Sequence, residues 1–278
     1  MPALRPLLAF VLLLAASVAL AHEFWLAPPA YFVAPGTTRS LRVLVGENFQ
    51  GERWAGKSNR VTRLLHSAPG AAPLDLTAAA TAADTLHPAV TFAQPGTHLV
   101  ALATTNAFLT LDADKFNAYL KEDGLDDALR RRQQRGQLAQ PGREAYRRCA
   151  KTLVLAGPAP AAADTSRHWA RPLGLALELV PEQNPYALAP GASLTVRVLA
   201  DGQPQAGQLV HVWQRRAGQP VRRSRLRSNQ NGRVLFRLPE PGQYLLSAVH
   251  MVPAALPNAD WQSTWSTLTF GFGPAPKP

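Results

Sequence analysis

Cysteine and acidic residues are scarce in this chain of 278 residues. The single cysteine, Cys149, excludes an internal disulfide framework and a cysteine-rich zinc site. Eighteen acidic residues face 29 lysines and arginines, which gives a formal charge of +11. Only 17% of the residues are charged and 46% are hydrophobic, so the composition predicts a folded core and not a disordered chain.

Apolar runs long enough to span a membrane are absent from the body of the chain. The first 21 residues instead resemble a secretory signal. Arg5 supplies a positive start, Leu7 to Val18 is apolar, and Ala19-Leu20-Ala21 is a small-x-small cleavage site. A retained anchor helix is the weaker interpretation because the apolar run is short. We therefore expect cleavage after Ala21, a periplasmic or secreted protein, and His22 as the new amino terminus.

The usual catalytic motifs are also missing. No His-x-x-x-His, Gly-x-Ser-x-Gly, phosphate-binding glycine loop or dinucleotide fingerprint occurs. The sequence therefore predicts a protein that is not an enzyme. We expect Cys149 to be buried or packed under a helical insert, and not to be a nucleophile.

Proline and glycine, by contrast, are plentiful, with 25 and 19 residues, as is typical of many short strands and turns. Residues 22–156 read as a β-rich domain, in which Leu41, Val43 and Val45 alternate with their neighbours. Residues 113–150 switch to helical spacing and predict a helical insert, with a second short helix from Arg143 to Cys149. Further strand candidates are Thr97 to Thr104, Ala107 to Leu111 and Thr152 to Ala156.

Residues 157–170 are rich in alanine, proline and glycine and predict a linker. Residues 171–278 then contain six apolar runs separated by Pro-Gly, Asp-Gly and Asn-Gly turn signals. This pattern predicts an antiparallel β-sandwich and resembles prealbumin-like or Ig-like modules. The expected fold is thus all-β, with two antiparallel β-sandwich domains and a helical insert in the first.

Arginine is concentrated in two stretches. Seven of the 29 basic residues lie within 130–148 and eight within 215–237, and residues 202–239 contain no acid. One interpretation is an anionic partner such as a lipid surface or polysaccharide; the other is a set of solvated faces. A nucleic-acid partner is not expected, because the chain carries an export signal and has few interleaved aromatic residues.

The histidines carry the clearest chemistry. A terminal His22 would offer its α-amine and its imidazole Nδ1 to one metal as a chelate, and such nitrogen ligands suit nickel, copper and zinc. A third ligand from a sheet would complete the site, with His250 the first candidate and His98 the second. Glu23 and Glu47 are further carboxylates whose position the sequence does not fix. The alternative is that His22 only begins a strand and that His250 is a structural histidine.

Several segments together resemble one family. They are His22-Glu23-Phe24-Trp25-Leu26, Val45-Gly46-Glu47, Asn184-Pro185-Tyr186-Ala187-Leu188, Ala248-Val249-His250-Met251, and the stretches 112–120 and 141–151. The resemblance is to domain-of-unknown-function family 4198, whose members are often labelled periplasmic components of nickel/cobalt uptake systems. It spans nearly all of residues 22–272 and implies a tentative divalent metal (nickel, cobalt or copper) and a membrane metal transporter as partner.

Two functions follow from the sequence. The first is an exported protein that binds nickel or cobalt for uptake or delivery. The alternative is a non-enzymatic cell-envelope binding or adhesion module that contacts anionic lipid or polysaccharide. A hydrolase ranks third because no catalytic constellation is visible.

Overall fold

The computed structural model describes residues 22–158 and 167–274. The predicted signal segment and most of the predicted linker lie outside this range. Within the described ranges, no helix is both long enough and apolar enough to cross a membrane.

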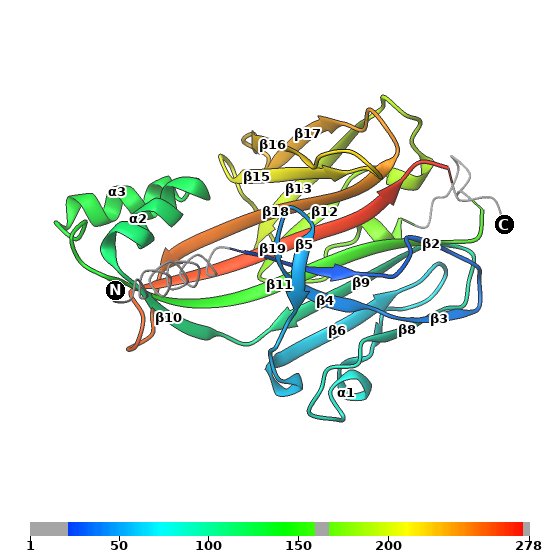
Figure 1. The fold of residues 1–278 in the computed structure, drawn as a ribbon, viewed down its shortest axis with the longest axis horizontal. Coiled ribbons are helices and arrows are strands. Elements are labelled where there is room, and N and C mark those ends of the chain that lie inside the picture. Colours follow the sequence, from blue (N-terminus) through cyan, green and yellow to red (C-terminus); the bar gives the residue numbers. More distant parts are fainter. Residues whose placement is uncertain (1–21, 159–166, 275–278) are drawn as a thin grey trace, which may run out of the picture.

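A ten-stranded sheet forms the body of the molecule (Figure 1). Most neighbouring strands are antiparallel, but β11 and β19 run parallel, as do β11 and β2. The strand order is β16 (Arg222–Arg227), β15 (Leu209–Arg215), β18 (Gly242–Pro253), β19 (Trp261–Phe272), β11 (Gly142–Ala156), β9 (Gly96–Thr104), β6 (Val61–Ser67) and β7 (Leu74–Asp75), with β10 (Ala107–Leu111) and β2 (Phe32–Val33) also paired to β11.

Smaller sheets cover the ten-stranded sheet and make a β-sandwich. A four-stranded sheet consists of β12 (Leu177–Pro181), β13 (Ser193–Ala200), β14 (Gln203–Pro204) and β17 (Arg233–Arg237). Its buried side chains share one core with those of β15, β18 and β19, including Val196, Leu246 and Phe270. The remaining sheets are β1 (Glu23–Ala27) with β4 (Arg42–Glu47) and β5 (Gln50–Arg53), and β3 (Thr37–Ser40) with β8 (Ala89–Phe92).

Two helices pack at one end of the ten-stranded sheet, α2 (Ala113–Glu122) and α3 (Asp126–Gln134). The apolar face of α2, with Phe116 and Leu120, packs against Trp261 and Trp265 of β19. The prediction that residues 113–150 hold the substantial helices is confirmed; α1 (Thr77–Ala80) is a single turn, and three short 3-10 turns lie at Ser58–Arg60, His168–Ala170 and Pro185–Ala187.

The second short helix predicted from Arg143 to Cys149 is wrong. These residues belong to β11, which extends without a break from Gly142 to Ala156. The strand is hydrogen-bonded to β10 and β9 on one side and to β19 on the other. Pairing on both edges overrides the weak local helical spacing of this segment.

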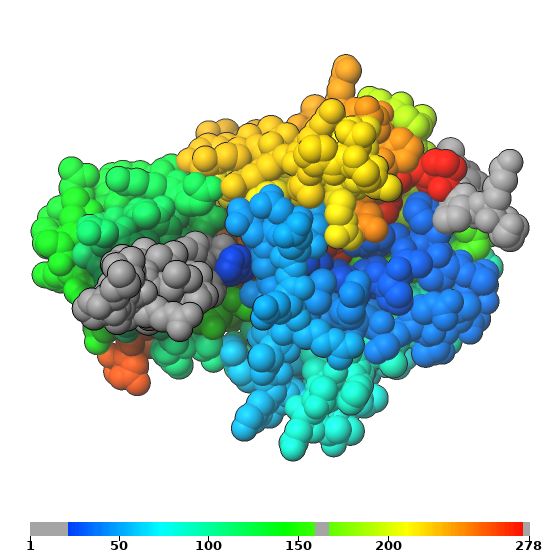
Figure 2. Space-filling model, viewed as in Figure 1, coloured from blue at the N-terminus to red at the C-terminus, as the bar shows by residue number. Residues whose placement is uncertain are grey.

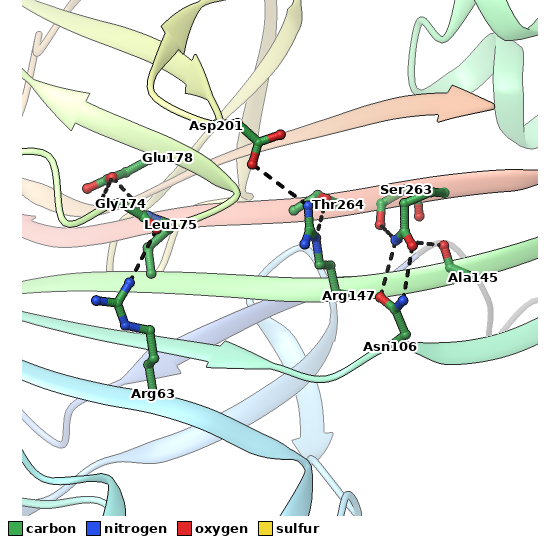
Figure 3. A network of polar contacts seen from close by, with 11 residues as sticks. Arg63, Asn106, Ala145, Arg147, Gly174, Leu175, Glu178, Asp201, Ser263 and Thr264 are labelled. Atoms are coloured by element: carbon green, nitrogen blue, oxygen red, sulfur yellow. Dashed lines mark hydrogen bonds and ion pairs between the residues drawn. The ribbon is translucent and has the colours of Figure 1, made fainter. Parts of the chain in front are cut away.

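The two halves of the chain share the ten-stranded sheet, because β11 comes from the first half and β19 from the second. The strands before and after the predicted boundary at 157–170 therefore do not form two separate sheets. Polar contacts reinforce the junction (Figure 3): Arg63 donates to the carbonyl of Gly174 at 3.2 Å, and Arg147 donates to Thr264 at 3.0 Å.

Cys149 is buried, with 2% of its surface exposed. Its apolar neighbours are Ala101, Ala103 and Leu175. The prediction that Cys149 is buried is confirmed. Of the two places allowed for it, the cysteine packs between β9 and the segment before β12, away from the helices.

Candidate functional site

The first strand begins directly after the predicted cleavage point. All five residues of β1 are buried, which fits its apolar sequence. Thr267 and Thr269 of β19 donate from their hydroxyls to the carbonyls of Phe24 and Leu26, at 2.7 and 2.9 Å. These two contacts fix β1 on the face of the ten-stranded sheet that also carries α2, so His22 lies at a defined position above that face.

The side chain of Glu23 points into this face. Its carboxyl oxygen Oε1 accepts from the Ser247 hydroxyl of β18 at 3.4 Å, while Oε2 is buried and has no partner among the described residues. Burial raises the pKa of Glu23 to about 7; the Glu47 carboxylate raises it further and the Arg223 guanidinium opposes the shift. A buried carboxyl group with an unused oxygen is costly unless it serves another purpose.

Five further residues surround Glu23 or lie next to it. We call this set the amino-terminal cluster. It comprises His22, Glu23, Glu47, Asp123, His211 and Arg223.

His211 of β15 lies opposite Ser247 in the strand register and thus on the same sheet face as Glu23. The Nη2 atom of Arg223 is 2.8 Å from His211 Nδ1 and 2.7 Å from Glu122 Oε1. Arginine can only donate, so the nearest imidazole nitrogen accepts and the ring is neutral. Burial, and then the Arg223 and Arg225 charges, lower the pKa of His211 to about 4.

Asp123 closes the cluster from the carboxyl end of α2. Only 9% of its surface is exposed, and its Oδ2 has no partner among the described residues. Burial raises the pKa of Asp123 to about 8, and the charge of Glu23 adds to the shift. The carbonyl groups at a helix carboxyl end also disfavour a negative charge.

The β4–β5 hairpin forms the remaining wall. Its two-residue turn, Asn48-Phe49, has φ angles of 54° and 59°. Asparagine tolerates this left-handed conformation, but phenylalanine rarely adopts it. Phe49 is held there by Trp213 and by Arg215, whose guanidinium carbon lies 4.7 Å from the ring centre. Glu23, Glu47, Phe49 and Trp213 line a crevice with no room for a water molecule.

His98 does not join this cluster. Its Nδ1 is 2.9 Å from His66 Nε2 and its Nε2 is 2.7 Å from the carbonyl of Gln94, so both ring nitrogens are occupied. The strand register also separates it from the start of β1, because the guanidinium carbon of Arg148 on β11 lies 5.4 Å from the ring centre of Phe24. His98 is paired with Val154, six residues further along β11, which is about 20 Å at roughly 3.3 Å per residue.

His250 lies on β18, three positions after Ser247, and projects from the sheet face opposite to β1. It alternates with Val249 and Met251, which contact α2 and α3, and with Ser247, which contacts Glu23. Its Nδ1 lies 3.4 Å from Gln208 Oε1, and it borders a separate pocket with Asp127. The geometry therefore gives no support to a shared metal for His22 and His250.

Of the carboxylates noted in the sequence, Glu23 and Glu47 do come together, whereas sequence reasoning missed His211 and Asp123. His211 lies in a strand whose residues are buried on both faces, so the sequence pattern did not show which sheet face the His211 side chain occupies. No three histidine, cysteine, aspartate or glutamate side chains within 22–158 and 167–274 form a ready-made metal site. A cation at the amino-terminal cluster would thus need a further donor, and the α-amine of a cleaved His22 would be one.

Comparisons with solved structures include three distant similarities. The D0–D1 domain of intimin shares 11% identity at a TM-score of 0.20, and the match covers 90% of this chain and 98% of that one. The FN1–FN3 domains of chicken CNTN1 and a tetra-tandem repeat of a large adhesion protein share 8% and 9% identity, each at a TM-score of 0.20. These matches cover 90% of this chain, and 68% and 49% of the respective structures.

No curated protein matches the chain. The profile of one family does match, over residues 19–252, which is most of the sequence and includes β1, the hairpin turn, α2 and His211. The protein therefore belongs to the family described as Domain of unknown function (DUF4198).

Proposed function

We propose that this protein is exported, cleaved between Ala21 and His22, and binds a divalent transition metal at its new amino terminus. Nickel and cobalt are the metals we favour, with copper as a further possibility for the same nitrogen donors. The observation that carries the proposal is the buried Oε2 of Glu23, which has no partner within 22–158 and 167–274. This atom lies one residue from the α-amine that cleavage would create.

After cleavage, the amino-terminal cluster would contain the amine, imidazole and carboxylate donors that divalent transition metals bind. The α-amine and imidazole of His22 would chelate the ion, and Glu23 would supply an anionic oxygen. His211 holds a neutral imidazole nearby, which is the form that binds metals. Bound metal would supply a compensating positive charge for carboxyl groups that burial otherwise keeps protonated.

Proton release is part of this binding. Glu23, with a pKa of about 7, and Asp123, with a pKa of about 8, hold protons near neutral pH. A cation favours their ionised forms, so binding would expel protons into solution. Arg223 would keep its contact with Glu122 and balance the remaining negative charge.

The test is calorimetric titration of nickel, cobalt and copper into protein that begins at His22. It should be released from a fusion that leaves no extra residue. We expect one metal per chain, with proton release detected by comparing buffers of different ionisation enthalpy. Adding one alanine before His22, or replacing Glu23→Gln, should weaken binding by roughly tenfold or more. The extension turns the His22 α-amine into an amide, and the substitution replaces an anionic oxygen with a neutral one.

Two matched variants sharpen the test. His211→Gln should weaken binding, while His250→Gln, on the opposite sheet face, should not. Equal losses for both histidines, or unchanged binding after the alanine extension, would contradict this site. We infer that the bound metal is delivered to a membrane metal transporter, which is the partner that the family resemblance implies.

The alternative function, binding to an anionic lipid or polysaccharide, is supported by few unpaired arginines in 215–237. Of the eight arginines in 215–237, six donate a hydrogen bond from the guanidinium group in the described structure. The acceptors include the side chains of Glu122, Asp126, Glu182 and Glu240 and the carbonyls of Phe49 and Glu122. Arg223, Arg225 and Arg227 dock the helices α2 and α3 onto the edge of the sheet. We therefore do not propose a general anionic surface as the main function.

A further inference from the structure

A groove lies at the open edge of the sandwich, and its lining of apolar side chains and arginines differs from that of the amino-terminal cluster. β16 is the last strand of the ten-stranded sheet, and β17 pairs only with β13 among the described strands. Figure 1 shows β16 and β17 close to each other, and in Figure 2 this second-half segment forms the upper rim of the molecule. The groove between the two strands has a volume of about 350 Å³.

The groove is partly apolar. Leu226 of β16 and Phe236 of β17 pack against the core but remain half-buried, and both line it. Leu235, beside them, is 62% exposed and is the most exposed large hydrophobic side chain of the described structure. Exposed apolar side chains gathered at one edge are typical of a binding surface.

The charge of the groove is also distinctive. Arg222 and Arg237 are the two arginines of 215–237 without a side-chain hydrogen bond or ion pair in the described ranges, and both line the groove. The six others are used within the molecule. Since residues 202–239 contain no acid, the two free guanidinium groups have no counter-charge within this segment.

The backbone of β16 adds a third feature. Just after β16, the amide of Ser228 donates to the carbonyl of Gln208, the residue before β15, at 3.0 Å. In an antiparallel pair the direction of backbone groups alternates, so the amides and carbonyls of Arg223 and Arg225 face away from β15. They leave an unpaired edge directly beside the groove.

We propose that this edge binds an extended acidic segment of a partner protein, which adds to β16 as a further strand. Backbone hydrogen bonds to Arg223 and Arg225 would hold the segment in register. Its acidic side chains would contact Arg222 and Arg237, and its apolar side chains would cover Leu226 and Phe236. This mode combines backbone affinity with side-chain selectivity, as in other cases of strand addition.

The test uses a short, acetylated, fluorescent peptide of alternating glutamate and valine, measured by anisotropy against the full mature chain. A peptide with lysine in place of glutamate is the charge control. We expect the acidic peptide to bind and the basic one not to bind. The double variant Arg222→Glu, Arg237→Glu should weaken binding by roughly tenfold or more, since two charge-assisted contacts are lost.

Two matched pairs separate strand addition from general attraction. The double variant Arg131→Glu, Arg135→Glu makes the same charge change at exposed arginines of α3 and its end, and should bind like the wild type. Arg225→Pro should bind more weakly than Arg225→Ala, because only the former lacks the backbone N–H. No binding of the acidic peptide overturns the proposal. The proposal is also overturned if the Arg225→Pro and Arg225→Ala variants bind the peptide equally and polyglutamate displaces the peptide completely. That result would indicate a general polyanion-binding surface.

Discussion

Lys151 of β11 and Glu178 of β12 form an ion pair of 2.9 Å in which neither side chain is more than 2% exposed. The Glu178 carboxylate also accepts the backbone amides of Leu173, Gly174 and Leu175. The pair thus joins a strand of the first half to the chain that enters the second. Its carboxylate is fully used by the ammonium group and three amides, which is what makes burial of both charges tolerable.

Removing one partner of this pair should be strongly destabilising. Lys151→Met leaves a buried carboxylate without its counter-charge, and we expect a loss of about 3 to 5 kcal/mol in the free energy of unfolding. Urea denaturation measures it. Arg130→Met, which breaks the exposed pair with Asp127, is the control and should cost no more than about 1 kcal/mol. A Lys151→Met protein as stable as that control would contradict this role.

Acid should destabilise the protein through His66. Burial, and then the nearby His98 and His168, lower the pKa of His66 from 6.5 to about 4. Between these values the unfolded chain binds a proton at His66 that the folded chain does not, so stability falls as the pH decreases through this window. Each such group contributes a slope of at most about 1.4 kcal/mol per pH unit.

The variant His66→Gln isolates this contribution. Its amide keeps a donor toward His98 Nδ1 but does not titrate. We expect a shallower loss of unfolding free energy between pH 6.5 and pH 4 than in the wild type. His87→Gln, at an exposed position, should leave the slope unchanged. Identical slopes for both variants would show that His66 does not resist protonation in the folded protein.

A rise in pH from about 4.5 to about 7 should destabilise the protein through Glu144. This carboxyl group accepts from the Tyr119 hydroxyl at 3.2 Å and from Ser263, and burial raises its pKa from 4.5 to about 7. The folded chain retains a proton that the unfolded chain releases, so stability is lost as the pH rises through this range. Glu144→Gln should therefore gain about 1 to 3 kcal/mol relative to the wild type between pH 5 and pH 8. The exposed Glu52→Gln is the matched control in urea denaturation.

Much of the fold was predictable because apolar alternation and turn signals are local. Ala107 to Leu111 was predicted with the observed bounds, and Thr97 to Thr104 within one residue of them. Arg222 to Arg227 was missed, since an exposed edge strand of arginines has no apolar alternation. The Arg143 to Cys149 error has a different cause, because that segment becomes a strand through pairing on both edges.

The candidate site was less predictable because it depends on register. Side chains along β18 alternate between β1 on one sheet face and the four-stranded sheet on the other. A register shift of one residue would therefore exchange the two sets. Ser247 meets Glu23, whereas His250, three positions later, projects from the opposite face. His211 lies 188 positions from Glu23 in the sequence, so only the folded sheets bring them together.

Cys149 should react with a thiol reagent only when the protein unfolds. It is 2% exposed, and burial raises the pKa of its thiol, so both access and thiolate formation are suppressed. We expect the labelling rate in urea to follow the unfolded fraction measured by tryptophan fluorescence. Cys149→Ser should cost about 1 to 3 kcal/mol, because a hydroxyl is costlier than a thiol to bury among Ala101, Ala103 and Leu175 even though the backbone of Leu177 contacts it, whereas Cys149→Ala should cost less. Rapid labelling of the folded protein would contradict this packing, and equal losses for the two variants would assign the cost to volume and not to polarity.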